Sequence, residues 1–175
     1  MRREALCRRM PCMKRMPHLL LPLLLLITAL PLFGLEPGDK APPFANPDLT
    51  SRHVLSRDFL GKGWLIVDFF ATDCEGCKKE LPVLETLHRE FGARLPILVF
   101  ATDPAGQPVV EPYFRANPSA LTVVLDRYQA TVKRYGVSEI PSLFLVDPKG
   151  TIVLKQVGFQ EGLDERIRAH LASGR

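Results

Sequence analysis

Residues 67–82 read VDFFATDCEGCKKELP, and this stretch decides the fold. Its first residues belong to an apolar run of aromatic and branched side chains, Trp64–Ala71, which predicts a strand buried on both faces. From Cys74 to Phe91, apolar residues recur at helical spacing, and Gly92 is placed to end a helix. The chain therefore passes from a buried strand into a helix at Cys74.

Two cysteines, Cys74 and Cys77, stand at the predicted start of this helix. Unpaired backbone amides and the helix dipole favour negative charge there, and the thiolate is the reactive form of cysteine. The spacing places both sulfurs on one turn, so one can attack a disulfide and the other can resolve the product. We expect Cys74 to be the exposed attacking thiol and Cys77 the shielded resolving thiol. The redox group would be the Cys74–Cys77 disulfide, with no other cofactor and no metal.

Three other uses of a Cys-x-x-Cys pair are possible: a zinc site, a structural disulfide and peroxide reduction. A structural zinc ion needs two more ligands, and none of the histidines forms a second ligand pair: His18, His53, His88 and His170. A peroxidatic cysteine of the peroxiredoxin type would follow a threonine three residues earlier, where this chain has Ala71. The residues favour disulfide exchange, with a zinc site and a structural bridge as the less favoured alternatives.

The flanking sequence alternates between strand-like and helix-like patterns. Strands are predicted at Pro96–Ala101, Leu121–Leu125, Ser142–Asp147 and Thr151–Val157, and helices at Val109–Ala116, Asp126–Tyr135 and Leu163–Leu171. Asp126 is a plausible cap and Gly136 a plausible end for the helix between them, and Pro148-Lys149-Gly150 predicts a hairpin turn. Phe44–Leu55 would form a small additional hairpin. This order predicts an α/β domain with a mixed central sheet flanked by helices.

The same residues carry a resemblance to a known family. VDFFATDCEGCKKELP resembles the active-site segment of thioredoxins, and within that fold it is most similar to the TlpA-like, ResA-like and DsbE-like membrane-tethered thiol–disulfide oxidoreductases. GVSEIPSLFLVDPKGTIVLKQVGF, residues 136–159, resembles the second half of the family domain. The resemblance implies a thioredoxin-like fold with an N-terminal extension and a central αβ insertion.

The resemblance also implies roles for acidic residues near the cysteines. Cys74 matches the family nucleophile and Cys77 the resolving cysteine. Asp68 matches the buried acid under the active site, where a raised pKa would let it relay protons to or from Cys77. A hydrogen-bonded structural aspartate is the alternative. Glu80 matches a glutamate that influences acid–base properties in the ResA-like members, and its alternative is a solvated helix charge.

Further matches concern the groove that faces the cysteines. Pro141 matches the family's cis-proline, preceded by Ile140, in a loop that offers backbone groups to an extended client chain. Gly158 matches a glycine at the same groove. Two positions depart from the family pattern, because Asp73 stands where tryptophan is usual and Gly76 where proline is frequent. Both departures affect the redox potential and the choice of partner.

The N-terminal 35 residues have a different composition from the rest. Residues 1–17 carry a net charge of +5, whereas the remainder carries −1, so the overall +4 gives no nucleic-acid-binding footprint on the domain. Leu19–Leu35 has no charged residue, and the pattern predicts either a cleaved signal peptide or an N-terminal membrane anchor. Cys7 and Cys12 precede it, and we expect them to be incidental thiols with no functional role. Residues 36–175 would form the thioredoxin-like domain.

These observations predict an exported thiol–disulfide oxidoreductase, in the periplasm or on the extracytoplasmic face of the membrane. It would reduce disulfides of client proteins and receive electrons from a membrane thiol donor. Analogy with the family suggests clients in cytochrome c maturation. The alternative is a thioredoxin-fold binding module or metal-delivery protein that uses the cysteines as ligands.

Overall fold

A computed structural model describes residues 34–174 of the chain. The predicted targeting segment, apart from its last two residues, lies outside the described residues, as do Cys7 and Cys12. Within residues 34–174, no helix combines the length and the apolar character that a membrane span requires.

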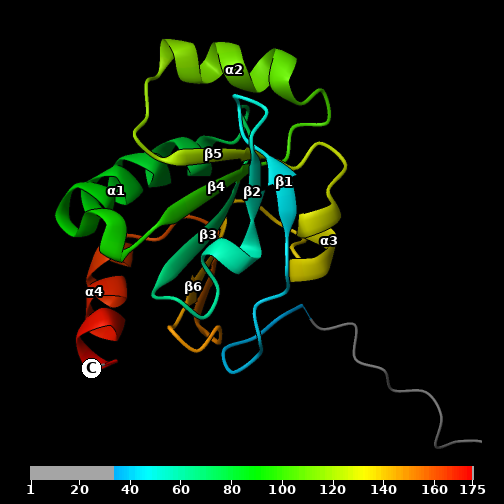
Figure 1. Ribbon diagram of the computed structural model, residues 1–175. Helices are drawn as coiled ribbons and strands as arrows, with labels where there is room; N and C mark the ends of the chain where they lie inside the picture. The colour runs from blue at the N-terminus through cyan, green and yellow to red at the C-terminus, as the bar shows by residue number, and fades with distance from the viewer. Residues whose placement is uncertain (1–33, 175) are drawn as a thin grey trace, which may run out of the picture. The chain divides into compact units, whose positions relative to one another are not determined.

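The centre of the domain is a five-stranded mixed sheet (Figure 1). Its strands are β3 (Leu65–Phe70), β4 (Ile97–Ala101), β5 (Thr122–Leu125), β6 (Ser142–Val146) and β7 (Ile152–Val157). They lie in the order β5-β4-β3-β6-β7, with β3, β4 and β5 parallel and β6 antiparallel to both of its neighbours. The mixed sheet predicted from the sequence is confirmed, and β3, which leads to the cysteines, is its central strand.

Residues 34–174 contain four α-helices. They are α1 (Glu75–Phe91), α2 (Gln107–Ala116), α3 (Ala130–Tyr135) and α4 (Leu163–Ser173), with short 3₁₀ turns η3 (Ser56–Asp58) and η4 (Gly92–Arg94). The thioredoxin-like fold is confirmed, and α2 with β5 forms the additional helix–strand unit expected in its middle. The predicted N-terminal hairpin is also present, as β1 (Ala45–Pro47) paired with β2 (His53–Leu55).

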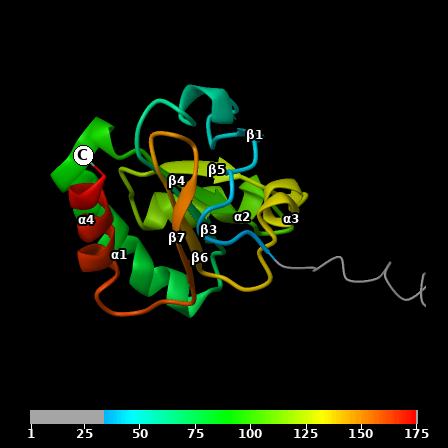
Figure 2. The same ribbon diagram turned by 90° about the horizontal axis from the view of Figure 1, so that it is seen from below.

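Hydrophobic side chains cover both faces of the sheet. Successive residues of a strand point to opposite faces, so Ile66 and Phe70 lie in the core with α1, α2 and α4, whereas Val67 and Phe69 lie in the core with α3 and the N-terminal hairpin. Figure 2 shows α1 and α4 side by side, with α3 on the other side of the sheet. This double coverage explains why every residue of β3 is buried.

The helix α1 begins and ends where the sequence predicts. Cys74 has extended backbone angles and is the N-cap residue, and its sulfur accepts a hydrogen bond from the Cys77 amide. Gly92 ends the helix with φ of 51°, a region that glycine enters without steric cost. Pro82 lies inside the helix.

The start of α3 differs from the prediction. Residues 126–129 form a turn closed by a 2.7 Å hydrogen bond from the Gln129 amide to the Asp126 carbonyl, and the helix begins at Ala130. The Asp126 carboxylate still accepts hydrogen bonds from the amides of Thr131 and Val132. Asp126 therefore satisfies the first amides of α3 from a position before the turn, because its side chain reaches across it.

The Cys74–Cys77 turn and the Pro141 loop lie at the same edge of the sheet. The carboxyl ends of the parallel strands β3, β4 and β5 meet there. Because β6 runs antiparallel to β3, its first residues, which follow Pro141, lie at the same edge. The Cys74–Cys77 turn and the Pro141 loop thus lie at one end of neighbouring strands.

Candidate functional site

The two cysteines form a disulfide, with their Cα atoms 5.2 Å apart. Cys74 is partly exposed, whereas Cys77, on the buried side of α1, is only 1% exposed and packs in the core between α1 and the sheet. The Cys77 amide donates a 3.1 Å hydrogen bond to the Cys74 sulfur. A backbone donor directed at this sulfur would stabilise the thiolate that forms on reduction. The difference in exposure is the one expected for an attacking and a resolving thiol.

A buried acid that the sequence reading did not single out fixes the chain before Cys74. Asp103, which follows β4 and is 6% exposed, accepts hydrogen bonds from the Thr72 amide at 3.1 Å and the Thr72 hydroxyl at 2.5 Å. Thr102 continues this connection, since its amide and hydroxyl both donate to the Phe70 carbonyl. The turn that presents Cys74 is therefore tied to the end of the neighbouring strand. Acidic residues after buried parallel strands are the signal that could have indicated it.

The Pro141 loop lies directly against the Cys-x-x-Cys turn. The Ile140–Pro141 peptide bond is cis, as the resemblance implies. A Cβ atom built on Gly76 would lie 3.0 Å from the Pro141 ring and 3.8 Å from the Phe159 Cβ. The Gly158 amide donates a 2.8 Å hydrogen bond to the Pro141 carbonyl. Glycine between the cysteines thus allows close contact with Pro141.

Two carboxyl groups, Asp68 and Glu80, are buried on facing elements beneath the cysteines. Asp68 points to the same side of β3 as Ile66 and Phe70, and Glu80 follows Cys77 by one turn on the buried side of α1. Each is 1% exposed. Asp68 Oδ1 and both Glu80 carboxyl oxygens make no hydrogen bond with the described residues. Unpaired buried carboxyl oxygens favour protonation over ionisation.

Burial therefore dominates the ionisation of both acids. It raises the pKa of Asp68 well above its ordinary value, and the nearby charge of Glu80 raises that pKa further. Burial raises the pKa of Glu80 from 4.5 to about 7. The alternative reading of Glu80 as a solvated helix charge is wrong, because its carboxyl faces the sheet. Its proximity to Asp68 was not predictable from sequence spacing.

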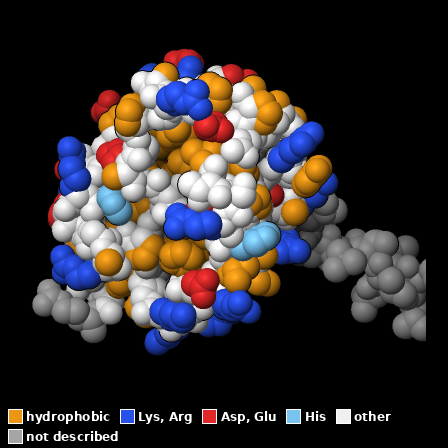
Figure 3. Space-filling view, turned by 45° about the horizontal axis from the view of Figure 1, so that its top comes forward, with side chains coloured by type: hydrophobic (Ala, Val, Ile, Leu, Met, Phe, Trp, Pro, Cys, Tyr) orange, Lys and Arg blue, Asp and Glu red, His pale blue; other side chains and the backbone are white. Residues whose placement is uncertain are grey.

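The surface around Cys74 is mixed in charge. Asp73 is exposed beside it, and Glu75 forms an exposed ion pair with Lys78, at 2.6 Å. The hydrogen bond and charge of Lys78 lower the pKa of Glu75, so its carboxylate persists next to the disulfide. Figure 3 shows Lys, Arg, Asp and Glu side chains interspersed over one face of the molecule rather than gathered by sign.

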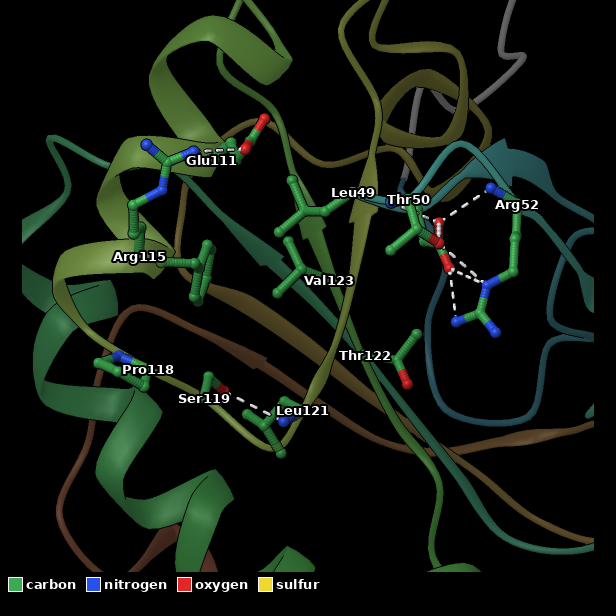
Figure 4. Close-up of a pocket in the computed structure, with 12 residues that line it drawn as sticks. Leu49, Thr50, Arg52, Glu111, Arg115, Pro118, Ser119, Leu121, Thr122 and Val123 are labelled. Carbon is green, nitrogen blue, oxygen red and sulfur yellow. Dashed lines mark hydrogen bonds and ion pairs between the residues drawn. The ribbon is translucent and has the colours of Figure 1, made fainter.

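A separate pocket with a volume of about 440 Å³ lies between the β1–β2 turn, α2 and the beginning of β5 (Figure 4). Its two arginines already pair with carboxylates, Arg52 with Asp48 and Arg115 with Glu111. It contains no cysteine and lies toward the amino end of β5, away from the disulfide edge. Among residues 34–174, no group of three or more His, Cys, Asp or Glu is placed to hold a metal ion.

Comparisons with known proteins agree with this geometry. The AhpC/TSA family matches residues 37–155. The thiol-disulfide oxidoreductase ResA of Bacillus thuringiensis subsp. konkukian is 32% identical over 140 residues, covering 77% of this chain and 78% of that protein. ResA of Bacillus anthracis is also 32% identical, over 138 residues, covering 77% and 76%.

Solved structures share the fold of residues 34–174. The thioredoxin domain of a thiol-disulfide oxidoreductase from Bacteroides vulgatus superimposes with a TM-score of 0.69 at 27% identity, covering 78% of this chain and 98% of that one. StoA from Bacillus subtilis superimposes with a TM-score of 0.62 at 23% identity, covering 74% and 96%, and this likeness concerns the fold.

Proposed function

The chain belongs to the AhpC/TSA family, with relatives named as ResA thiol-disulfide oxidoreductases, and from this premise we propose that it is a protein thiol–disulfide oxidoreductase acting through Cys74 and Cys77. One observation carries the proposal: a disulfide at the start of α1 that joins a partly exposed sulfur to a buried one. Because of this difference in exposure, a client can reach the Cys74 sulfur, whereas the Cys77 sulfur is shielded from it.

The proposed direction is reduction of client disulfides. The Cys74 thiolate attacks a client disulfide, forming a mixed disulfide and releasing one client thiolate, which takes up a proton. The Cys77 thiolate then attacks the Cys74 sulfur, so that the second client thiol leaves and the Cys74–Cys77 disulfide forms. Two electrons pass from the cysteine pair to the client. The disulfide is the only redox group this reaction needs.

We propose that Asp68 relays the proton during the second step. The thiol of Cys77 must lose its proton to attack, and it is buried on the face of the sheet to which Asp68 points. A carboxyl group whose pKa is raised can accept and return a proton near neutral pH. Glu80, beside it, would set the pH range in which this exchange occurs. Ile140, Pro141 and Gly158 would line the client-binding groove.

The site of action is proposed to be outside the cytoplasmic membrane. The support is the basic and apolar N-terminal sequence, read as a signal peptide or an anchor. In the periplasm or at the extracytoplasmic face of the cytoplasmic membrane, the protein would receive electrons from a membrane thiol donor. Its clients would be exported proteins, with apocytochrome c thiols in cytochrome c maturation as the family analogy suggests.

Trapping of mixed disulfides tests the proposal. In the full chain, Cys77→Ser leaves Cys74 able to attack but removes the resolving thiol, so client adducts accumulate. Cys74→Ser is the matched control and forms none through residue 77, because that thiol is buried. Alkylation across a series of dithiol buffers should show zero or two free domain thiols for the wild-type protein. If no adduct forms in any redox state, the proposed function is wrong.

A further inference from the structure

Exposed large hydrophobic side chains are few, and they lie toward one end of the strands of the sheet. Among residues 34–174, the exposed large hydrophobics are Val109, at 39%, Tyr128, at 80%, and Val157, at 40%. Val109 lies in the first turn of α2, after β4, and Tyr128 follows β5. Val157 ends β7, which runs in the same direction as β3 because two antiparallel pairings separate them. All three therefore lie at the sheet edge that carries Cys74.

The sheet order places these side chains on both sides of the disulfide. Cys74 follows the central strand β3, Tyr128 lies two strands away after β5, and Val157 lies two strands away in the other direction on β7. With strands about 4.8 Å apart, β5 and β7 each lie about 10 Å from β3, the strand that leads to the disulfide. Val157 precedes Gly158, whose amide donates a hydrogen bond to the Pro141 carbonyl. The Tyr128 side has no part in the mechanism above.

Tyr128 stands in a turn that is closed by the hydrogen bond from the Gln129 amide to the Asp126 carbonyl. The Arg127 guanidinium lies over its ring, 5.6 Å from the centroid. The Arg127 stem packs across Gly106, where an added Cβ would lie 3.1 Å from the arginine Cδ. Asp126, before them, is buried and binds the amides of α3. An aromatic ring that is 80% exposed contributes little to the core, so its position suits binding.

The same turn borders a groove with a volume of about 480 Å³. Its lining includes Ala45, Pro47, Pro108, Leu125 and Tyr128. A groove of this size accepts one or two side chains. Six of its ten lining residues are apolar or aromatic, and the polar ones are Asn46, Gln107, Asp126 and Arg127. The Asp126 carboxylate already accepts hydrogen bonds from the amides of α3. Arg127, at its rim, forms no ion pair or hydrogen bond with the described residues. A bulky apolar group together with an acidic group would complement this surface.

We propose that Tyr128, Arg127 and the adjoining groove form a client-docking surface. It binds a client segment that carries an acidic side chain next to a bulky apolar one. Because an extended chain advances about 3.3 Å per residue, this pair stands about three residues from the client cysteine attacked by Cys74. The inference rests on the proposed function and adds a determinant of client choice, and Tyr128 and Arg127 are specificity residues rather than catalytic ones.

Defined peptide disulfides test this surface. Each probe is a ten-residue peptide whose single cysteine forms a mixed disulfide with glutathione, with Asp-Phe centred three residues from the cysteine on either its amino or its carboxyl side. The fully reduced full chain is mixed with the peptide, quenched in acid, and assayed by mass spectrometry for the Cys74–Cys77 disulfide. Hydroxyethyl disulfide, which has no side chains to dock, measures the basal exchange reaction.

Each Asp-Phe peptide has a counterpart in which Lys-Ser replaces Asp-Phe at the same positions. Wild-type protein should react faster with one of the two Asp-Phe peptides than with its counterpart. Tyr128→Ala and Arg127→Gln should each slow the reaction with that peptide by about three- to tenfold, through a rise in KM. The rate with hydroxyethyl disulfide should be unaffected. Lys149→Gln, an exposed charge at the opposite edge, is the control. Arg127→Glu should reverse the preference toward a Lys-Phe peptide, which loss of structure alone would not do. The Arg127 effect should shrink at high salt.

The outcomes separate this inference from the function on which it rests. If wild-type protein reduces hydroxyethyl disulfide but neither variant changes any peptide rate, the docking surface is refuted and the function stands. If wild-type protein reduces no disulfide, the proposed function itself fails. If sedimentation shows wild-type dimers that Tyr128→Ala abolishes, the surface binds a second copy and the client proposal is overturned.

Discussion

The Asp103 carboxylate accepts hydrogen bonds from both the amide and the hydroxyl of Thr72, two residues before Cys74. The whole of α1 and β4 separates the two residues in sequence, and they meet because β3 and β4 are parallel neighbours. The loop that delivers the reactive sulfur is thereby braced by the adjacent strand.

Asp103→Ala should destabilise the oxidised protein by about 2 kcal/mol, because hydrogen bonds to a carboxylate are lost and the Thr72 amide keeps no protein acceptor. Urea unfolding measures this change. Thr72→Val, which removes the hydroxyl alone, should cost less. In the double variant the two losses should not add, since both act on one interaction. Additive losses would contradict the bracing role.

Glu80→Gln should change how stability depends on pH. Burial raises the pKa of Glu80 from 4.5 to about 7, so between these values the folded protein holds a proton that the unfolded chain has released. The stability contributed by this group is complete below pH 4.5 and is lost as the pH rises through 7. Glu80→Gln should therefore stabilise the protein at pH 8, on the order of 2 kcal/mol, and leave it nearly unchanged at pH 4.5.

Urea unfolding of the oxidised protein across this pH range provides the measurement. Glu139→Gln, which alters an exposed carboxylate, should leave the profile unchanged. An unchanged pH profile in Glu80→Gln would mean that the carboxyl is ionised in the folded protein.

Asp68→Asn should slow the formation of the Cys74–Cys77 disulfide from the mixed disulfide by about tenfold or more near pH 7, because the amide cannot accept the Cys77 proton. Rapid-quench measurement of the mixed disulfide isolates this step. The first attack by Cys74 should keep its rate, and Asp58→Asn, a change at an exposed acid, should affect neither step. Equal slowing of both steps would indicate a structural role for Asp68 instead.

Gly158→Ala should destabilise the protein by roughly 1 kcal/mol through its backbone alone. Gly158 has φ of +72°, which is costly for a residue with a Cβ, yet no atom lies within 4 Å of the added carbon. The strain should also loosen the hydrogen bond to the Pro141 carbonyl and slow reaction with peptide disulfides. Gly63→Ala, where the added carbon also meets open space, is the control for thermal unfolding. Equal unfolding temperatures for the two variants would exclude backbone strain.

The architecture around the cysteines could be predicted from the amino-acid sequence. The apolar run before Cys74 and the helical spacing after it predicted β3 and α1, and the Pro-Lys-Gly turn predicted the β6–β7 hairpin. These features depend on local periodicity and turn chemistry, which are readable in one chain segment. The start of α3 was misplaced because a turn closed by the Asp126 carbonyl competes with a longer helix.

Which residues come into contact depends on the packing of the whole domain. Periodicity shows that Glu80 lies on the same side of α1 as Cys77, but the packing of α1 on β3 places it near Asp68 and raises the pKa of both acids. The parallel register brings Asp103 to Thr72, and the returning strands bring Pro141 against Gly76. Burial and long-range pairing depend on how several elements pack at once, so no single segment of the sequence encodes them.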